Sequence, residues 1–202
     1  MEDIGASVGR TSSFRHRVGV MDEKEIEKPA NGSDAWPDQI FTILKKFKVR
    51  QVTYVPDGGH AALIRQVHAD ADMIPVTLTT EEEGVAILAG AWIGGDRGVL
   101  LMQSSGVGNC INMLSLVKTV NFPFFALVTM RGEFGEFNPW QVPMGSATPG
   151  ALELMGIQVL RATNPGEVYE VVHAGAAMAY GGHTPTAVLL SQRLIGAKVF
   201  AE

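Results

Sequence analysis

One stretch of the chain joins an apolar strand pattern directly to an apolar helix pattern, and this junction constrains the fold more than any other feature. Residues 74–78 read IPVTL, which is typical of a buried strand, and residues 84–93 contain no charged side chain. A helix that is apolar on every side is normally buried. The three glutamates between the two segments, at positions 81–83, are therefore expected at the edge of a buried structure.

The same junction predicts a site for proton chemistry, although a structural interpretation competes with it. A carboxyl group near low-dielectric surroundings tends to have a raised pKa, so that its proton becomes available to a ligand. Alternatively, Thr80 and Glu83 fit a capping box, and Glu81 interacts favourably with the helix dipole. Glu82 aligns with small residues of the following turns, which would let another surface approach it, but periodicity alone does not separate it from its neighbours.

From residue 36 onward, apolar segments with strand character alternate with helical segments. Helices are expected at 36–47, 60–68, 81–93, 109–120, 149–155 and 165–180, and strands at 51–55, 74–78, 99–103, 124–130, 158–161 and 186–191. This alternation predicts a single three-layer α/β domain, with a parallel sheet of about six strands and helices on both faces. Ligand sites in such folds gather at the carboxyl ends of the strands, where polar residues follow at 56–58, 79–82, 103–106, 129–132 and 191–193.

Length and composition fit one compact domain preceded by a different kind of segment. The chain has 202 residues, of which 46% are hydrophobic and 23 are glycine, as expected for an α/β protein with tight turns. Residues 1–34 are polar and are expected to form a flexible extension, whereas residues 35–202 are expected to form the domain.

Charge and hydropathy exclude several classes of partner and location. A net charge of −5 gives no reason to expect nucleic acid or an anionic membrane as a partner. No apolar run reaches the about 20 residues that span a bilayer, and no secretory signal is recognisable, so a cytoplasmic location is expected. The single cysteine, Cys110, rules out an internal disulfide and a cysteine-based zinc site, and is expected to be a small buried residue.

Familiar catalytic motifs are absent or incomplete. The segment Gly106-Val107-Gly108 follows a strand as in dinucleotide-binding proteins, but Ile111 occupies the third glycine position. The chain has no GxxxxGK[ST] phosphate loop and no GxSxG setting, and its five histidines show no metal-ligand spacing. What remains is a glycine-rich turn at 105–109, the glutamates, and Arg131, which would pair with an anionic substrate group or form a surface salt bridge.

Several motifs, taken in order, resemble the pyrimidine-binding (PYR) domain of thiamine-diphosphate-dependent decarboxylases. The similarity covers roughly residues 36–193 and includes VPD at 55–57, GVAILAGAW at 84–92, MQSSGVGNCIN at 102–112, TMRGE at 129–133, PMGSAT at 143–148 and LMGI at 154–157. The resemblance is to alpha subunits of sulfopyruvate decarboxylases first and to phosphonopyruvate decarboxylases second. It implies a carboxy-lyase that converts 3-sulfopyruvate to sulfoacetaldehyde and CO2.

Other substrates and functions stay open on the same residues. Three aromatic residues in the stretch 131–141 favour a bulkier or aromatic 2-oxo acid as an alternative, and phosphonopyruvate is another. A non-catalytic regulatory module of the same ancestry is a second hypothesis, and a nucleotide-binding α/β domain is a third.

The resemblance also implies roles for individual residues. In the family, the glutamate at the position of Glu82 hydrogen-bonds the aminopyrimidine ring nitrogen of thiamine diphosphate, so Glu82 is the expected catalytic residue. The residues expected to contact the cofactor are Glu82, Ser105, Gly106, Asn109 and Pro56. The residues expected on the substrate side are Asp57, Gly58, His60, Gln103 and Arg131.

Finally, the resemblance implies that this chain supplies only half of an active site. In the family, a second domain, marked by Gly-Asp-Gly and a later Asn, binds the diphosphate and Mg²⁺, and here Gly95-Asp96-Arg97 breaks that motif. A separate beta subunit is therefore expected to hold the diphosphate and Mg²⁺, in an α2β2 or higher assembly. No metal ligand is expected in this chain, and it is expected to be active only with its partner.

Overall fold

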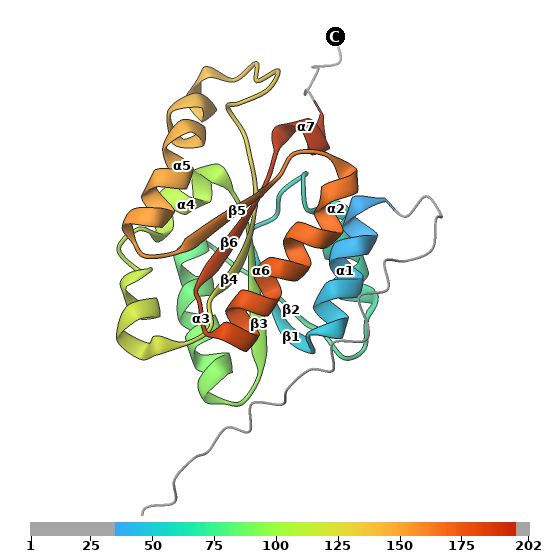
Figure 1. Cartoon of the computed structure of the whole chain (residues 1–202), viewed down its shortest axis with the longest axis vertical. Coiled ribbons are helices and arrows are strands. Elements are labelled where there is room, and N and C mark those ends of the chain that lie inside the picture. The colour runs from blue at the N-terminus through green and yellow to red at the C-terminus, as the bar shows by residue number, and fades with distance from the viewer. Residues whose placement is uncertain (1–34, 197–202) are drawn as a thin grey trace, which may run out of the picture.

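The computed structural model describes residues 35–196, which form a three-layer α/β domain. All six strands are parallel and lie in the order β2-β1-β3-β4-β6-β5 (Figure 1). The strands are β1 (Val49–Tyr54), β2 (Ile74–Thr77), β3 (Arg97–Gln103), β4 (Phe125–Thr129), β5 (Gln158–Ala162) and β6 (Thr186–Leu190). The predicted fold class is confirmed, whereas the extension predicted for residues 1–34 lies outside the described residues.

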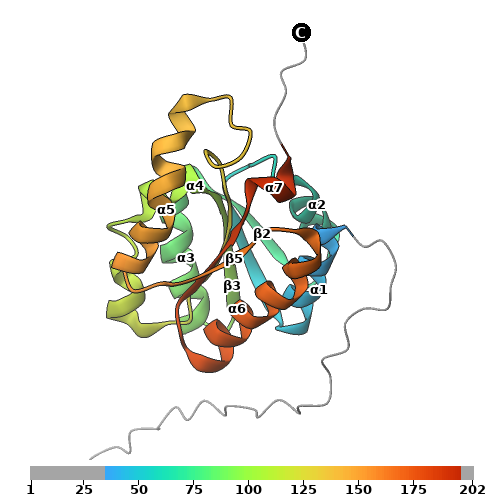
Figure 2. The ribbon, with the colours of Figure 1, turned by 45° about the horizontal axis from the view of Figure 1, so that its top comes forward.

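Helices cover both faces of the sheet (Figures 1 and 2). One layer contains α1 (Trp36–Lys46), α2 (Ala61–Ala69) and α6 (Val168–Gly182). The opposite layer contains α3 (Glu81–Ile93), α4 (Ser104–Cys110) and α5 (Val142–Leu154). Shorter helical segments are η1 (Val117–Asn121), η2 (Pro139–Gln141), η3 (Pro165–Glu167) and α7 (Gln192–Ile195).

The hydrophobic core consists of two clusters, one on each side of the sheet. Successive side chains of a strand point to opposite faces, so that Leu127 joins the cluster under α1 and α6 while Val128 joins the cluster under α3 to α5. Strands β4 and β6 are buried along their whole length, and the edge strand β2 is partly exposed. The exposed edge also explains how Pro75 is tolerated within a strand, since proline cannot donate a ladder hydrogen bond.

Two helices begin earlier than expected from the sequence, and the helix expected to run to residue 120 ends at Cys110 and is followed by the separate segment η1. Helix α4 begins at Ser104, directly after β3, although two glycines in its first turns made a loop the expected structure. Helix α5 begins at Val142, seven residues before the expected start, and contains Pro149 in its interior. Both helices are held by packing rather than by propensity, because Gly108 lies against Met144 and Leu152 is fully buried.

The strand order places a ligand-binding position at β1 and β3. From β1 the chain runs to β2 on one side and then crosses to β3 on the other, so the order of building reverses there. In open α/β sheets, ligands bind at the carboxyl ends of the strands at such a reversal. No helix within residues 35–196 combines the length and apolar character needed to cross a membrane.

Candidate active site

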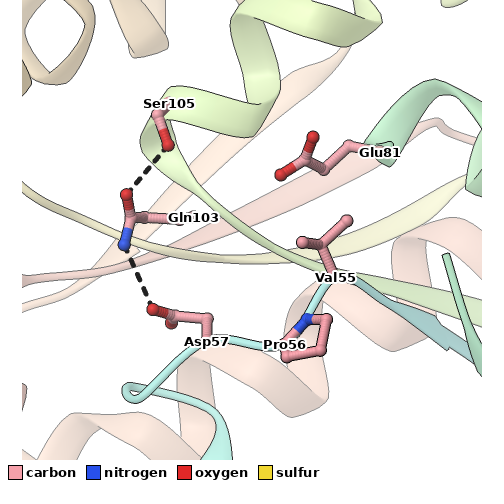
Figure 3. A pocket seen from close by; sticks show the side chains of 6 residues that line it. All are labelled: Val55, Pro56, Asp57, Glu81, Gln103 and Ser105. Atoms are coloured by element: carbon pink, nitrogen blue, oxygen red, sulfur yellow. Dashed lines mark hydrogen bonds between the residues drawn. The ribbon is translucent and has the colours of Figure 1, made fainter. Parts of the chain in front are cut away.

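A pocket of about 130 Å³ lies at the carboxyl ends of β1 and β3 (Figure 3). The residues that line it are Val55, Pro56, Asp57, Glu81, Gln103 and Ser105. The first three follow β1, Glu81 begins α3, Gln103 ends β3, and Ser105 lies in α4. The fold thus brings together four of the residues that the sequence predicted, which are Pro56, Asp57, Gln103 and Ser105.

Asp57 is held in place by donors from three different segments. Its Oδ1 accepts a hydrogen bond from Gln103 Nε2 at 3.1 Å, and its Oδ2 accepts from Thr129 Oγ1 at 2.7 Å and from the Gly59 backbone N–H at 3.1 Å. Ser105 extends this chain, because its Oγ donates to Gln103 Oε1 at 2.8 Å. The polar wall of the pocket is therefore a connected network.

Glu81 is the second carboxylate of the pocket, and the sequence did not single it out. It is only 8% exposed, and its Oε2 accepts a hydrogen bond from Asn109 Nδ2 at 2.8 Å. Its carboxyl group lies against Gly106, where an added Cβ would overlap the Glu81 carboxyl carbon. Two further predicted residues, Gly106 and Asn109, therefore lie beside the pocket through their contacts with Glu81.

Glu82 faces a different direction from Glu81. It is half-buried and does not line the pocket, and its Oε2 accepts a hydrogen bond from Thr80 Oγ1 at 3.1 Å. The expected capping box does not form, because the Thr80 side chain makes no cap hydrogen bond and Glu83 accepts from the Thr79 N–H instead. Glu82 lies on the same side of α3 as the exposed Ala86, and its predicted catalytic role stays a prediction.

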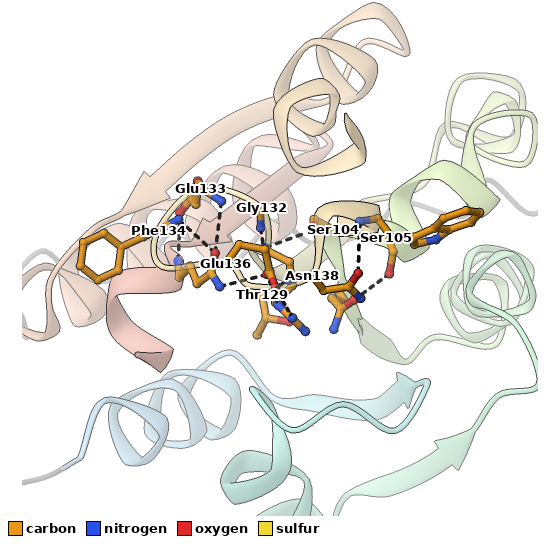
Figure 4. A network of polar contacts seen from close by, with 12 residues as sticks. Ser104, Ser105, Thr129, Gly132, Glu133, Phe134, Glu136 and Asn138 are labelled. Atoms are coloured by element: carbon orange, nitrogen blue, oxygen red, sulfur yellow. Dashed lines mark hydrogen bonds and ion pairs between the residues drawn. The ribbon is translucent and has the colours of Figure 1, made fainter. Parts of the chain in front are cut away.

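Arg131 forms a buried ion pair rather than a surface salt bridge. Its Nε donates to Glu136 Oε2 at 2.6 Å and one terminal nitrogen donates to Oε1 at 2.7 Å. The two side chains are 8% and 4% exposed, and Figure 4 shows Glu136 within a network of polar contacts. The Arg131 guanidinium lowers the pKa of Glu136 to about 2, and Glu136 in turn raises the pKa of Arg131. Arg131 does not line the pocket, and its guanidinium instead binds Glu136 within the loop that follows β4.

The remaining two predicted residues also lie outside the pocket lining. His60 is 1% exposed, and its Nε2 donates to the Leu127 carbonyl oxygen at 3.1 Å. Burial lowers the pKa of His60, which keeps the imidazole neutral, and its Nδ1 has no hydrogen-bond partner. Gly58 is exposed in the turn before α2.

The aromatic residues of the loop after β4 do not shape the pocket. Phe134 and Phe137 are exposed, Trp140 is 85% exposed, and none of the three lines the pocket. The Arg193 guanidinium lies 4.4 Å from the centre of the Phe134 ring, so this ring packs against a cation of α7. The aromatic character of this stretch therefore gives no support to a bulkier substrate.

Two further features bear on the chemistry. Within residues 35–196, no group of three or more histidine, cysteine or acidic side chains is arranged to hold a metal ion. Cys110 is fully buried, and burial raises the pKa of its thiol to about 12, so the expectation of a small buried residue is confirmed.

Comparison with known proteins identifies the family. No protein-family model matches the chain. The chain is 34% identical to the sulfopyruvate decarboxylase alpha subunit of Methanococcus maripaludis, over 69% of this chain and 84% of that protein. It is 32% identical to the corresponding subunit of Methanocaldococcus jannaschii, over 74% of this chain and 89% of that protein. The chain belongs to the sulfopyruvate decarboxylase alpha-subunit family.

Other relatives support the same class of enzyme. A phosphonopyruvate decarboxylase of Streptomyces viridochromogenes is 37% identical over 54% of this chain and 28% of that protein. The named relatives are decarboxylases, which are carboxy-lyases, and the predicted enzyme class is confirmed at the level of the family. The 2-oxoglutarate:ferredoxin oxidoreductase of Magnetococcus marinus shares the fold, with a TM-score of 0.66 and 15% identity over 80% of this chain and 29% of that chain.

Proposed function

We propose that this chain is the alpha subunit of a thiamine-diphosphate-dependent decarboxylase that converts 3-sulfopyruvate to sulfoacetaldehyde and CO2. Three relatives that match over 82% to 89% of their own length are sulfopyruvate decarboxylase alpha subunits. The observation that carries the proposal is the start of α3, where Glu81 lines a polar pocket at the reversal of strand order and Glu82 is the next residue. This is where the resemblance requires a carboxyl group for the cofactor.

The residues at this position fit the pyrimidine half of thiamine diphosphate. An aminopyrimidine ring carries N–H donors, which match a pocket wall that contains the acceptor oxygens of Asp57, Glu81 and Ser105. Its ring nitrogens accept hydrogen bonds and therefore need a protonated carboxyl group. None of the pocket-lining residues is basic, which agrees with a diphosphate held elsewhere. When bound, the cofactor supplies the nucleophilic carbon and the electron sink for decarboxylation.

In this proposal the protein's own residues orient the ring and exchange protons with it. For its proposed role, Glu82 exchanges its hydrogen bond from Thr80 for one to a nitrogen of the ring, where it holds a proton. General acid–base help of this kind contributes about 10²- to 10⁴-fold to rate. Asn109 and Gly106 fix Glu81 against the pocket wall, and Asp57 is fixed by its three donors. A network that is already in place needs little reorganisation when the ligand binds.

We further propose that a beta subunit covers the outer side of α3. Beyond Glu82, the exposed residues on this side are Ala86, Gly90 and Ile93, and Ile93 is 75% exposed. Small uncharged residues permit close approach of another surface, and covering them would bury Glu82 at the subunit junction. The beta subunit would hold the diphosphate and Mg²⁺, most simply in an α2β2 assembly.

One longer relative supports the need for a second component. The sulfopyruvate decarboxylase of Methanosarcina acetivorans is 42% identical over 83 residues, which make up only 21% of that protein. Most of that decarboxylase therefore lies outside the matched stretch.

The proposal is tested by measuring CO2 release from 3-sulfopyruvate with thiamine diphosphate and Mg²⁺. The full chain is mixed with a candidate beta subunit that carries the Gly-Asp-Gly motif, and release is expected only when both are present. Glu82→Gln is expected to lower kcat by about 100-fold or more without preventing assembly. The matched control is Glu83→Gln, which should retain kcat within about 2-fold because Glu83 is exposed and accepts only from a backbone N–H.

The outcomes separate the competing functions. Normal turnover by the Glu82→Gln complex would remove the role of Glu82. Assembly without any cofactor-dependent CO2 release from sulfopyruvate, phosphonopyruvate or an aromatic 2-oxo acid would instead indicate a regulatory module. Phosphonopyruvate is the second candidate substrate, because two Streptomyces relatives are named phosphonopyruvate decarboxylases.

A further inference from the structure

The hydrogen-bond chain in the pocket has a fixed direction. A carboxylate can only accept, so the Nε2 amide of Gln103 must face Asp57, at 3.1 Å. The Oε1 atom of Gln103 then faces Ser105, whose Oγ lies at 2.8 Å and must donate its single proton. Only the lone pairs of the Ser105 hydroxyl are left for a ligand.

The rest of the pocket wall also offers hydrogen-bond acceptors. Asp57 and Glu81 contribute carboxyl oxygens, and none of the six lining residues is cationic. The guanidinium that the sequence suggested for the substrate side, that of Arg131, is paired with Glu136. Such a wall is complementary to a ligand group that carries N–H or O–H donors.

We propose that Gln103 is a positioning residue, which sets the direction of this chain so that Ser105 accepts a hydrogen bond from an N–H or O–H group of the ligand. This inference rests on the proposed function for the identity of the ligand. The direction of the hydrogen bonds from Ser105 through Gln103 to Asp57, however, is a property of the protein alone. Gln103 acts through Ser105, and Asp57 acts through Gln103.

A carboxyl group at position 103 distinguishes a role in hydrogen bonding from a role in packing, because only the first depends on whether that carboxyl group is protonated. When protonated, it can donate to Asp57 and accept from Ser105, as the amide does. When ionised, it repels Asp57 and has no proton to donate. Two carboxylates at hydrogen-bond distance titrate as a coupled pair, with one apparent pKa raised, so Gln103→Glu is expected to regain function as pH falls.

Other titratable groups near these residues are common to all variants. They are Glu81 from α3, His60 directly before α2, and Arg131 after β4. Their effects on kcat/KM cancel when the value for each variant is divided by the wild-type value at the same pH.

The experiment compares Gln103→Glu with the uncharged control Gln103→Met between pH 8 and pH 5.5. In the assembled enzyme, both variants should lose about 10-fold or more in kcat/KM at pH 8, about the loss expected for one broken hydrogen bond to a charged group. The deficit of Gln103→Glu should shrink several-fold by pH 5.5, whereas that of Gln103→Met should stay constant. The deficit in Tm of the full chain without its partner should follow the same pattern.

A double-mutant cycle tests whether Gln103 acts through Ser105. The kcat/KM of the double variant Gln103→Met/Ser105→Ala is expected to be no lower than that of Ser105→Ala alone, because the two residues act as one unit. Additive losses, or a Gln103→Glu deficit that does not change with pH, would overturn the inference. If the wild-type complex releases no CO2, the proposed function fails, and the Tm comparison still decides the direction of the chain.

Discussion

At the scale of single residues, the contact between Gly106 and Glu81 gives a sharp prediction. A side chain at position 106 would occupy the space of the Glu81 carboxyl group, so Gly106→Ala should displace it and break its hydrogen bond to Asn109. We expect kcat/KM to fall about 10-fold or more, since one broken hydrogen bond to a charged group costs about 1.5–3 kcal/mol. The measurement is steady-state kinetics of the assembled enzyme.

Gly181→Ala is the matched control for this prediction. Apart from the neighbouring backbone of α6, no atom lies within 4 Å of an added Cβ at this position, so the variant should keep wild-type kinetics and gain up to about 1 kcal/mol of stability. Equal kinetics for both variants would show that the placement of Glu81 does not matter to the reaction.

The sequence predicted a functional carboxylate at the start of α3 but gave no means to distinguish the two neighbouring glutamates. Helix α3 is apolar on all sides, so its sequence has no polar face that marks which side turns toward the sheet. The structure turns Glu81 inward together with Val85 and Leu88, one and two turns later. Asp57, Gln103 and Ser105 were accessible to prediction because each stands at the carboxyl end of a strand.

At the scale of elements, the loop after β4 is braced by the buried pair of Arg131 and Glu136. Glu136 also accepts hydrogen bonds from the backbone of Gly132 and Asn138 and from the Gln192 side chain (Figure 4). Glu136→Gln should lower the free energy of unfolding by about 3 kcal/mol at pH 7, because it leaves a buried guanidinium without its counter-charge. Thermal or urea unfolding of the full chain measures this loss.

The same pair gives this loop a defined dependence on pH. The pKa of Glu136 is lowered to about 2 in the folded state, from an ordinary value of 4.5. The stabilisation that Glu136 provides is therefore present above about pH 4.5 and is lost as pH falls toward 2. The stability difference between wild type and Glu136→Gln should therefore shrink across this window. The control Glu170→Gln, at an exposed position of α6, should parallel wild type, and a constant difference for Glu136→Gln would contradict the assignment.

Strands could be predicted more reliably than helix starts. Apolar β-branched runs placed all six strands, since burial on both faces leaves a continuous signal. The starts of α4 and α5 were wrong because glycine and proline disfavour helices in isolation, whereas here the contacts of Gly108 and Gly145 with neighbouring segments require a small residue. The ion pair of Arg131 was also beyond prediction, because its partner follows in an irregular loop.

At the scale of the whole molecule, the two helical layers differ in charge. In the layer of α3, α4 and α5, the only charged residue after the first turn of α3 is Glu153. The opposite layer carries lysines, arginine and acidic residues on α1, α2 and α6. The uncharged layer is thus the one suited to a partner subunit.

This difference predicts which surface variant blocks assembly. Ile93→Asp places a charge on the outer side of α3 and should weaken binding of the beta subunit by about 10-fold or more, with little change in Tm because Ile93 is 75% exposed. Thr42→Asp adds the same charge to an exposed position of α1 and should leave binding unchanged. Sedimentation of the mixed subunits measures both, and equal binding by the two variants would place the junction elsewhere.

The most direct measurement of the central claim is a solved structure of the full chain with its beta subunit and thiamine diphosphate. We predict that a Glu82 carboxyl oxygen lies within about 3 Å of a pyrimidine ring nitrogen, at hydrogen-bond distance. The diphosphate should contact only the partner. A Glu82 side chain left in solvent, or a cofactor bound away from the pocket beside Glu81, would contradict the account.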